Sequence, residues 1–539
     1  MQQHSRKMWF TVFGLAVGIL VGIYIQPVIS GDSIYEQLNK FKEVLFTVEK
    51  YYVDDVDTPE LVESAIGGML SELDPHSVYI PAEQQRRVEE DFRGSFEGIG
   101  IEFDMVRDTI TVVTAISGGP SDILGILSGD KIVAIEGKSA IGVDRNDVPE
   151  KLRGKKGTKV NVSIVRPGVQ DLMQFTITRD KIPLYTVDAS FVDENGVGYL
   201  KINRFADPTY TEMMQNLEDL SEKGMKRLIL DLRGNPGGYM ERAVRMADEF
   251  IGGKSKIVYT KSNRSGDEEV FRAHSGQKYE EIPLIVLVST GSASASEIMA
   301  GAIQDLDRGL IVGETTFGKG LVQKQFSLSD GSAYRLTVAR YYTPSGRLIQ
   351  RPYEDGRESY YSMAGREDED EGANINHSHD TKDTTRPTFK TAAGRTVLGG
   401  GGITPDYIVK PDTLVRTSGS WEMITQNVIW EYVESYLAGQ GNALRDRYKE
   451  NFKDFLHEFV ITDAMFENFV KMAEAKDIKV NRELLKHDVP LLKNRLKARI
   501  ARSIWGNNEF YQVALQDDKQ YQQALVLFPE AQKIAAMVK

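Results

Sequence analysis

The stretch PLIVLVSTGSASASEIMAGAIQD, residues 283–305, joins an apolar strand-like run to a turn of small residues and a helix-like segment. Three comparable apolar runs, GVGYLKI, RLILDLR and GLIVGE, flank it and are separated by helix-like stretches. Such alternation is expected of α/β units around a buried, largely parallel sheet. The sequence therefore predicts that the largest core of the chain is an α/β domain.

A glycine-rich turn follows each of three apolar runs, those at 228–232, 284–289 and 310–313. The turns are RGNPGG, TGSASASE and ETTFGKGLVQ. If the three strands are parallel neighbours joined by right-handed crossovers, their carboxyl ends share one edge of the sheet. Because ligand sites of open α/β sheets lie at this edge, we expect the three turns to form one site.

The second turn contains three serines at alternate positions, Ser292, Ser294 and Ser296. Ser294 and Glu297 have the spacing of a capping box, which on its own favours a simple cap for a helix that begins near Ala295. A serine at a helix N-terminus also lies beside free backbone amides and the positive end of the helix dipole, as an oxyanion requires. The residues alone leave open which serine is a nucleophile.

A proton acceptor for such a serine is not expected among the histidines. Only His76 and His274 belong to segments expected to be ordered near the core, and neither is expected at the carboxyl edge. Asp305 lies about 16 Å further along the helix than Ser294 and cannot touch it. Lys319, in the third turn, can reach the serine, and it acts as a base only if desolvation or nearby cations keep it neutral. A lone loop lysine would more often be solvated, but TFGKG offers an apolar site with no carboxylate expected beside the amine.

The motifs GSASASEIMAGAIQD and ETTFGKGLVQ resemble those of the carboxy-terminal processing peptidases, also called tail-specific proteases. These are Ser/Lys serine endopeptidases with a PDZ domain before the catalytic core. The resemblance extends from about residue 73 (LDPHSVYI) to about residue 406 (GGGITPD). It implies that Ser294 is the nucleophile, that Lys319 is the general base, and that Gln323 orients the lysine amine.

The first turn also resembles a motif of this family. LRGNPGG is similar to the segment whose backbone supplies an oxyanion donor. The resemblance implies that Gly238, or else Gly237, acts together with the amide of Ala295.

A strand-rich module at 91–182, with short β-branched runs and glycine turns, stands where the family has its PDZ domain. By resemblance, the segment GIGIEFD contains the carboxylate-binding loop, which comprises Gly98, Ile99, Gly100 and Ile101. An extended substrate tail would add as a strand while the loop amides hold its terminal carboxylate. In the basic stretch KLRGKKGTK, Arg153 is expected to face the protein and to link the bound carboxylate to the protease domain, whereas Lys155 and Lys156 are expected to be solvated.

The N-terminus is expected to anchor the chain to a membrane. Residues 8–25 are apolar and uncharged, Arg6 and Lys7 precede them, and PVISG after them is a poor cleavage site. A cleaved signal peptide is the alternative. Both readings place the rest of the chain in the cell envelope, either anchored at the periplasmic side of the inner membrane or exported after cleavage.

Changes in pattern along the chain predict a multi-domain α+β protein. The polar, acidic stretch 353–390 is poor in aliphatic residues and is expected to be a disordered insertion in the α/β domain. The expected order is a signal anchor at 1–31, an N-terminal helical region at 32–90, the strand-rich PDZ module at 91–182, a crotonase-like α/β protease core at 183–412 and a C-terminal helical domain at 413–539.

Composition narrows the range of partners. A net charge of -12 without a basic stripe argues against nucleic acid. The absence of cysteine excludes disulfides, thiolate catalysis and Cys-ligated zinc, and no HExxH motif is present, so neither a metal nor another cofactor is expected. The expected partners are protein or peptide substrates bound through their C-termini, the membrane through the N-terminal anchor, and other copies of the chain, with the oligomeric state left open.

These features predict a serine endopeptidase that cleaves exported or envelope proteins near or from their C-terminal tails. One alternative is a crotonase-like enzyme that acts on acyl-CoA thioesters, which would need neither a PDZ module nor an exported location. Another is a catalytically inactive PDZ/crotonase-like binding or scaffold protein. The joint presence of Ser294, Lys319 and Gln323 speaks against the inactive alternative.

Overall fold

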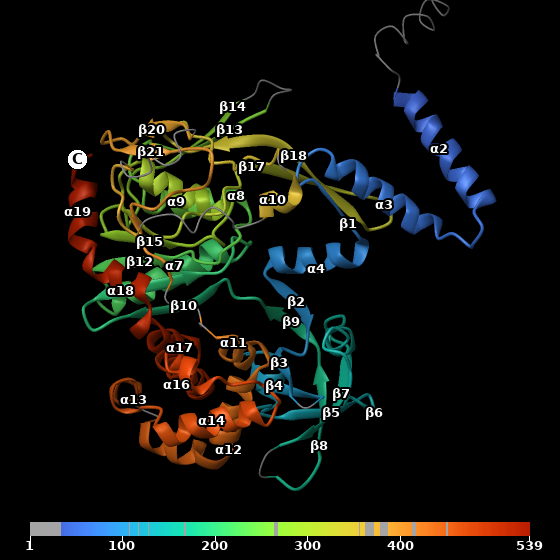
Figure 1. The fold of residues 1–539 in the computed structure, drawn as a ribbon, viewed down its shortest axis with the longest axis vertical. Helices are drawn as coiled ribbons and strands as arrows, with labels where there is room; N and C mark the ends of the chain where they lie inside the picture. Colours follow the sequence, from blue (N-terminus) through green and yellow to red (C-terminus); the bar gives the residue numbers. More distant parts are fainter. Residues whose placement is uncertain are drawn as a thin grey trace, which may run out of the picture.

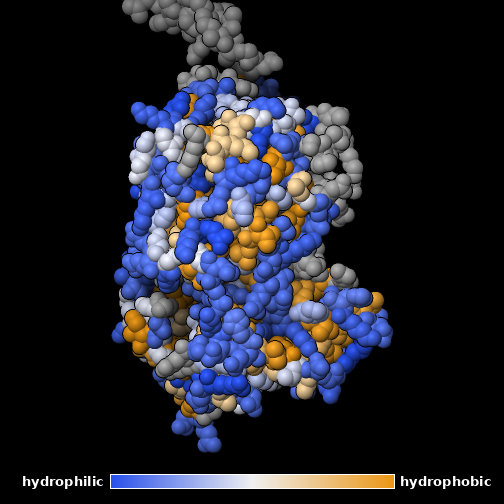
Figure 2. Space-filling view, turned by 90° about the vertical axis from the view of Figure 1, so that its left-hand side faces the viewer, coloured by the Kyte–Doolittle hydropathy of each residue, from blue (hydrophilic) through white to orange (hydrophobic). Residues whose placement is uncertain are grey.

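The computed structural model describes residues 34–538, except for 107, 117, 128, 167–168, 263–267, 355, 362–370, 378–385, 412–414, 416 and 449–450. The predicted membrane anchor at 1–31 lies outside the described residues. Among the described helices, none combines the length and the apolar character needed to cross a membrane. Figure 1 shows an α/β core, a strand-rich module and a separate group of helices, so the multi-domain α+β prediction is confirmed. The side of the surface drawn in Figure 2 is mainly hydrophilic, with apolar side chains in separate patches.

The α/β core is built on a seven-stranded sheet. Its strands lie in the order β10 (Val187–Val192), β11 (Val197–Ile202), β12 (Arg227–Asp231), β15 (Leu284–Val288), β16 (Leu310–Gly313), β22 (Tyr407–Ile408) and β19 (Gly372–Ala373). Neighbours from β11 to β22 are parallel, whereas β10 and β19 pair antiparallel at the two edges. The predicted parallel arrangement of β12, β15 and β16 is therefore confirmed, and the turns after them lie at one edge.

Helices cover both faces of this sheet. On one face lie α7 (Thr209–Glu222), α8 (Met240–Asp248) and α9 (Ala295–Asp305). In α7, Met213, Leu217 and Leu220 recur at helical spacing and are all buried against this face. Alternate strand residues such as Ile229 point to the other face, which packs against α18 (Lys519–Val526) and α19 (Phe528–Ala536).

The last two helices therefore belong to the α/β core, and the predicted C-terminal helical domain at 413–539 is wrong in this respect. The preceding helices share a separate apolar core: α11 (Ser418–Thr425), α12 (Val428–Tyr448), α13 (Phe452–Glu458), α14 (Asp463–Glu474), α15 (Arg482–Leu485), α16 (Val489–Ile504) and α17 (Asn507–Ala514). Only the short 3-10 helix η1 (Leu515–Asp517) separates the two groups. An amphipathic pattern shows that a helix buries one face, but it does not show which core receives that face.

A second, antiparallel sheet lies beside the first. Its strands are β1 (Val78–Ile80), β18 (Ala333–Tyr342), β13 (Lys256–Lys261) and β14 (Glu268–Arg272), with β17 (Leu321–Ser327) paired to the other side of β18. β17 begins directly after the third turn of the predicted site. The pairing of β1 with β18 brings the chain before residue 78 to the same region.

The strand-rich module has its own sheet and its own apolar core. The sheet comprises β3 (Ile101–Val106), β4 (Thr109–Ala115), β5 (Lys131–Ile135), β7 (Lys159–Val165) and β8 (Met173–Thr178), with β6 (Lys138–Ser139) beside β5. The module also contains the short helices α5 (Pro120–Ile123) and α6 (Val148–Leu152), and its core includes the fully buried Ile110, Val112 and Ile132. β3 is an edge strand of this sheet, so its outer side has no paired strand among the described residues. The antiparallel ribbon of β2 (Ser95–Gly98) and β9 (Asp180–Pro183) joins the module to the rest of the chain.

Three helices precede the module. α2 (Ile34–Tyr51) extends away from the body and has no buried residue (Figure 1). α3 (Thr58–Ser71) and α4 (Ala82–Arg93) follow, and α4 lies between the module and the α/β core. α4 ends at Gly94, which has a φ of 67° and whose added Cβ would lie 2.4 Å from Pro208, so glycine both ends the helix and allows the close approach.

The prediction of a disordered insertion at 353–390 is wrong for the described part of that segment. It contains α10 (Arg357–Tyr361), β19 and β20 (Thr388–Lys390), which pairs with β21 (Thr396–Leu398). Aromatic residues supply the apolar contacts that the low aliphatic content did not suggest: Tyr360 is buried, and its ring centroid lies 5.5 Å from that of Phe317. Residues 355, 362–370 and 378–385 lie outside the described part.

Candidate active site

The serine turn (residues 289–294) connects β15 to α9 through an unusual backbone conformation. Ser294 has a φ of 55 and a ψ of -112 degrees, a region that a residue with a Cβ rarely adopts. Such a conformation costs about 1–3 kcal/mol, persists only where the surrounding structure enforces it, and is concentrated at functional sites. The strain therefore singles out Ser294 as the candidate functional serine of the turn.

The hydroxyl groups of the two other candidate serines, Ser292 in the turn and Ser296 in α9, form hydrogen bonds within the fold. Ser292 Oγ donates to the carbonyl of Leu232 at 2.8 Å, and Ser296 Oγ donates to the carbonyl of Asn235 at 2.9 Å. Both side chains are fully buried, whereas Ser294 is partly exposed and lines a cavity. Of the three serines that the sequence left open, Ser294 is the accessible one.

Glu297 connects the serine turn to the lysine turn (residues 314–320). Its buried carboxylate accepts hydrogen bonds from the amides of Ser294 (2.7 Å), Gly318 (2.6 Å) and Lys319 (2.9 Å) and from Thr316 Oγ1 (2.6 Å). Burial raises the pKa of Glu297, and these donors oppose that rise. The expected contact between Glu297 and Ser294 is present, and the same carboxylate contacts the lysine turn through its backbone amides and Thr316.

The amine of Lys319 is withdrawn from solvent. Lys319 Nζ donates to Gln323 Oε1 at 2.7 Å. Burial is the main reason why the pKa of Lys319 falls to about 8, and Arg335 lowers it further, against the opposing effects of Glu297 and Asp74. A lysine with this pKa is neutral in a substantial fraction of molecules near pH 8, as a general base must be.

His76 lies beside this lysine, contrary to the expectation that it stays away from the carboxyl edge. Gln323 Nε2 donates to the backbone carbonyl of His76, which fixes the orientation of the glutamine amide. Burial, and then the nearby Lys319, lower the pKa of the His76 ring to about 4, and its Nε2 lies 2.7 Å from the hydroxyl of Tyr360. The imidazole is therefore neutral at pH 7, and His76 contributes to the site through its backbone carbonyl. The pairing of β1 with β18 brings His76 there, and no local pattern in the sequence predicts that pairing.

The glycine loop (residues 232–238) packs directly against the serine turn. Gly237 has a φ of 99°, and an added Cβ would lie 2.8 Å from both Ser294 Cβ and Ala295 N. The amide of Gly237 donates to Asn235 Oδ1 at 2.9 Å and is already used. The amides of Gly238 and Ala295 have no acceptor among the described residues. Of the two alternatives that the sequence offered, Gly238 is therefore the one whose amide, together with that of Ala295, is able to hold an oxyanion.

Ser294, Lys319, Gln323 and Gly238 line one cavity of about 650 Å³, the main cavity. The α/β core and the second sheet contribute Gly237, Gly238, Tyr239, Ser294, Ile298, Lys319, Leu321, Gln323 and Tyr341. The helix α4 contributes Val88, Glu89 and Phe92, and the ring centroid of Phe92 lies 4.8 Å from that of Tyr239. The helix that precedes the strand-rich module thus forms part of the cavity wall. In the part of the chain that the structure describes, no cluster of His, Cys, Asp or Glu side chains suited to a metal ion is found.

The predicted carboxylate-binding loop at 98–101 leads from β2 into the edge strand β3. The carbonyl of Ile99 accepts hydrogen bonds from Ser121 N at 3.1 Å and from Ser121 Oγ at 2.7 Å, which hold the loop in place. Gly100 has a φ of 75°. Within the described ranges, the amides of Ile99 and Gly100 have no acceptor, so both are able to bind a carboxylate.

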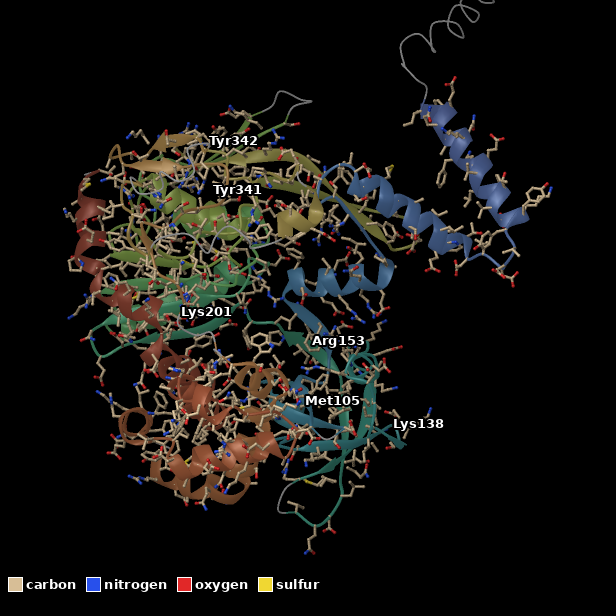
Figure 3. All side chains as sticks on the ribbon, viewed as in Figure 1. Met105, Lys138, Arg153, Lys201, Tyr341 and Tyr342 are labelled. Atoms are coloured by element: carbon tan, nitrogen blue, oxygen red, sulfur yellow. The ribbon has the colours of Figure 1, made fainter. Side chains whose placement is uncertain are left out.

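Arg153 lies between the strand-rich module and α4 (Figure 3). Its Nη1 forms an ion pair with Glu90 Oε2 at 2.5 Å, and its guanidinium carbon lies 4.3 Å from the centroid of the Phe96 ring. Arg153 does not line the main cavity, but Glu90 adjoins Glu89, which does. Arg153 therefore contacts α4, which forms part of the main cavity's wall.

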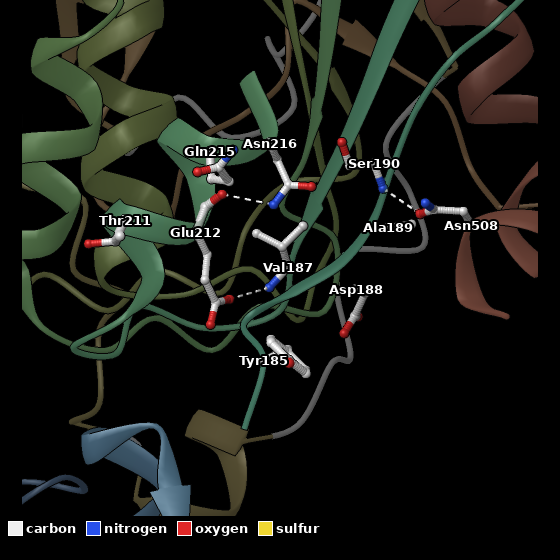
Figure 4. A pocket seen from close by; sticks show the side chains of 10 residues that line it. All are labelled: Tyr185, Val187, Asp188, Ala189, Ser190, Thr211, Glu212, Gln215, Asn216 and Asn508. Atoms are coloured by element: carbon white, nitrogen blue, oxygen red, sulfur yellow. Dashed lines mark hydrogen bonds between the residues drawn. The ribbon is translucent and has the colours of Figure 1, made fainter. Parts of the chain in front are cut away.

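A second depression of about 480 Å³ lies between α7, β10 and α17 (Figure 4). Two of its polar side chains bind backbone amides. Glu212 accepts hydrogen bonds from the amides of Thr186 (2.7 Å) and Val187 (3.2 Å), and Asn508 Oδ1 accepts one from Ser190 N (2.8 Å). These bonds occupy amides of the edge strand β10 and discourage pairing with another strand. None of the predicted site residues lines this depression.

Four segments of the chain match known families. Residues 196–355 match peptidase family S41, and residues 98–180 match a PDZ domain. Residues 26–84 match the N-terminal domain of the activating protease CtpB, and residues 421–506 match a family of unknown function. The first match contains the glycine loop, the serine turn and the lysine turn, and the second corresponds to the strand-rich module.

Curated relatives are similar over more than half of the chain. The carboxy-terminal-processing protease of Bartonella bacilliformis is 38% identical over 351 residues, which are 64% of this chain and 80% of that protein. The carboxy-terminal processing protease CtpA of Bacillus subtilis is 40% identical over 323 residues, covering 60% of this chain and 68% of that protein. Among solved structures, a photosystem II D1 C-terminal processing protease is 30% identical and covers 57% of this chain and 89% of that chain, with a TM-score of 0.33.

Proposed function

The chain belongs to peptidase family S41, among the carboxy-terminal processing proteases, and on this premise we propose that it is a serine endopeptidase with a Ser/Lys dyad. Ser294 is the nucleophile, Lys319 is the general base, and Gln323 orients the lysine amine. One observation supports the proposal: Ser294 lines the same cavity as Lys319, a partly buried lysine whose pKa falls to about 8. The proposal of an inactive scaffold finds no support in this arrangement.

In the first step, neutral Lys319 Nζ takes the proton of Ser294 Oγ as this oxygen attacks the scissile carbonyl. The oxyanion that forms accepts hydrogen bonds from the amides of Gly238 and Ala295 at the N-terminal end of α9. When the C–N bond breaks, the Lys319 ammonium returns the proton to the leaving amine. A water molecule then attacks the ester on Ser294 while Lys319 accepts its proton. The ester C–O bond breaks, Lys319 returns the proton to Ser294 Oγ, and the second product leaves with a new C-terminal carboxyl group.

We further propose that the strand-rich module binds the C-terminal tail of the substrate. The tail adds as a strand to the open edge of β3, and its carboxylate accepts hydrogen bonds from the amides of Ile99 and Gly100. Arg153 reads this carboxylate and transmits its presence through Glu90 to α4, which forms a wall of the main cavity. The substrates are exported or envelope proteins that are cleaved near or from their C-terminal tails.

The location and the assembly of the protein are also proposals. The apolar segment 8–25 anchors the chain, with the catalytic part at the periplasmic side of the inner membrane, or directs its export if it is removed. Copies of the chain associate through α2, which exposes large apolar side chains at Ile34, Tyr35, Leu38, Phe41, Val44 and Phe46.

The dyad is tested with a fluorogenic peptide that ends in a free carboxylate and with a fluorophosphonate label. Ser294→Ala should lose both cleavage and labelling, and Lys319→Met should lower turnover at least about a hundredfold. Ser327→Ala, at the exposed end of β17, is the matched serine control and should behave as the wild type. A Ser294→Ala or Lys319→Met protein that keeps a tenth of the wild-type turnover would contradict the Ser/Lys mechanism. A folded wild type that neither cleaves nor labels would favour the scaffold alternative.

A further inference from the structure

The glycine loop is held on its far side by the last helices of the chain. Arg233 follows β12, and only 15% of its side chain is exposed. Arg233 Nη1 donates to Asp518 Oδ1 (3.0 Å), Asp518 Oδ2 (2.8 Å) and Gln520 Oε1 (2.9 Å). Asp518 and Gln520 lie at the start of α18, on the opposite side of the α/β core from the main cavity's helix α9.

Asp231 supplies a second carboxylate that binds Arg233. Asp231 is fully buried and accepts hydrogen bonds from Arg233 Nε (3.0 Å), Arg233 Nη2 (2.7 Å) and the hydroxyl of Tyr199 (2.6 Å). Lys201, labelled in Figure 3, lies with Nζ 3.6 Å from Asp231 and donates to the carbonyl of Arg233 at 3.1 Å. Each guanidinium nitrogen of Arg233 thus donates to a carboxylate, and two cations balance the carboxylates of Asp231 and Asp518.

The other side of the same loop supports the reacting groups. The carbonyls of Leu232 and Asn235 accept the hydroxyl groups of Ser292 and Ser296, which flank the nucleophile. The loop ends at Gly238, whose amide has no acceptor in the described part of the chain. A movement of Arg233 would therefore shift both the serine turn and the oxyanion donor.

We infer that Asp518 and Gln520 are positioning residues that act through Arg233 on the glycine loop. This inference rests on the proposed function, because it assigns the amide of Gly238 to the oxyanion. If the acceptors on α18 are lost, Arg233 Nη1 is a buried charged donor without an acceptor on α18. The glycine loop then moves until Nη1 finds another hydrogen-bond acceptor. A displaced oxyanion donor stabilises the transition state less and changes substrate binding little. The C-terminal helices therefore contribute to turnover and not only to folding.

Asp518→Asn tests this inference. Asp518 also caps α18 by accepting the amide of Tyr521 at 2.8 Å, and asparagine is an equally good cap, so the helix is kept while an acceptor facing Arg233 is replaced by a donor. We expect kcat to fall about tenfold and KM to stay within about twofold of the wild type, because only transition-state binding is affected. A peptide boronate, which forms a tetrahedral adduct with the serine, should bind more weakly by the same factor. The pH midpoint of the rate should not change, because the surroundings of Lys319 are untouched.

The neighbouring Asp517 supplies the control. It accepts a hydrogen bond from Asn494 Nδ2 at 2.7 Å and does not contact Arg233, so Asp517→Asn should leave kcat and boronate affinity unchanged. Asp518→Ser, which keeps a capping oxygen too short to reach Arg233, replaces Asp518→Asn if the latter does not fold.

Three outcomes would overturn the inference. The first is a folded Asp518 variant with wild-type kcat and boronate affinity. The second is a loss of activity that matches the fraction of unfolded protein, since that would make the role of Asp518 purely structural. In both cases the wild type still cleaves, and the proposed function stands. A wild type that does not cleave removes the proposed function itself, and the inference with it.

Discussion

The rate of peptide cleavage is predicted to follow the ionisation of Lys319. With a pKa of about 8, roughly a tenth of the amine is neutral at pH 7 and roughly nine tenths at pH 9. Because only the neutral amine accepts the proton of Ser294, kcat/KM should rise about tenfold between these two pH values and then level off. The Arg335→Met substitution removes a cation that lowers this pKa, so the midpoint of the profile should move to higher pH.

The order of the causes bounds this movement. Burial lowers the pKa of Lys319 more than Arg335 does, and burial persists in the variant. The midpoint should therefore move to higher pH and remain below that of a free lysine. At pH 8 the variant should be slower than the wild type, by about fivefold for a movement of one pH unit, and the two rates should converge at the alkaline plateau.

The assay measures kcat/KM of a fluorogenic peptide from about pH 6 to about pH 10 at constant ionic strength. Arg340→Met is the matched control, because Arg340 lies on the same strand, is exposed, and is not among the groups that shift the pKa of Lys319. A wild-type profile that is flat from pH 7 to pH 9 would refute the neutral-lysine mechanism. A midpoint that stays in place or moves to lower pH in Arg335→Met would refute the electrostatic reasoning.

Two further substitutions test the supports of the site. Glu297→Gln leaves one acceptor oxygen for four donors, so two hydrogen bonds to a buried charged group are lost and the free energy of unfolding should fall by about 3 kcal/mol; a urea unfolding curve that overlays that of the wild type would contradict this. Arg153→Ala should slow cleavage of a substrate with a free C-terminal carboxylate more than cleavage of the same substrate with an amidated C-terminus, whereas the exposed Lys155→Ala should change neither rate. If amidation slows the wild type and Arg153→Ala equally, Arg153 does not read the carboxylate.

Much of the α/β core could be predicted because its signals are local. The apolar strands β12, β15 and β16 each end in a turn of small residues, and parallel pairing then places the three turns at one edge. The choice among Ser292, Ser294 and Ser296 was different. It needed either the family resemblance or the burial of two of the hydroxyl groups, and burial depends on contacts with the glycine loop, which is distant in sequence.

The supports of the site could not be predicted for the same physical reason. Glu297 has the sequence spacing of a cap, and nothing near it shows that its second oxygen meets Gly318. His76 acts through its carbonyl, which every residue possesses, so its side chain carries no signal. The face of α18 is amphipathic like those of the helices before it, and the sequence does not distinguish packing on the sheet from packing among helices.

The distribution of these supports along the chain has a consequence for the enzyme as a whole. The orientation of the general base depends on the backbone of His76, before the strand-rich module, and the wall of the main cavity depends on α4. The glycine loop depends on Asp518, close to the C-terminus. A site whose base, wall and oxyanion donor each rely on a different part of the chain is complete only when all these parts have docked on the α/β core. A chain that is only partly folded lacks some of these contacts, so we expect it to have little activity until all three parts are in place.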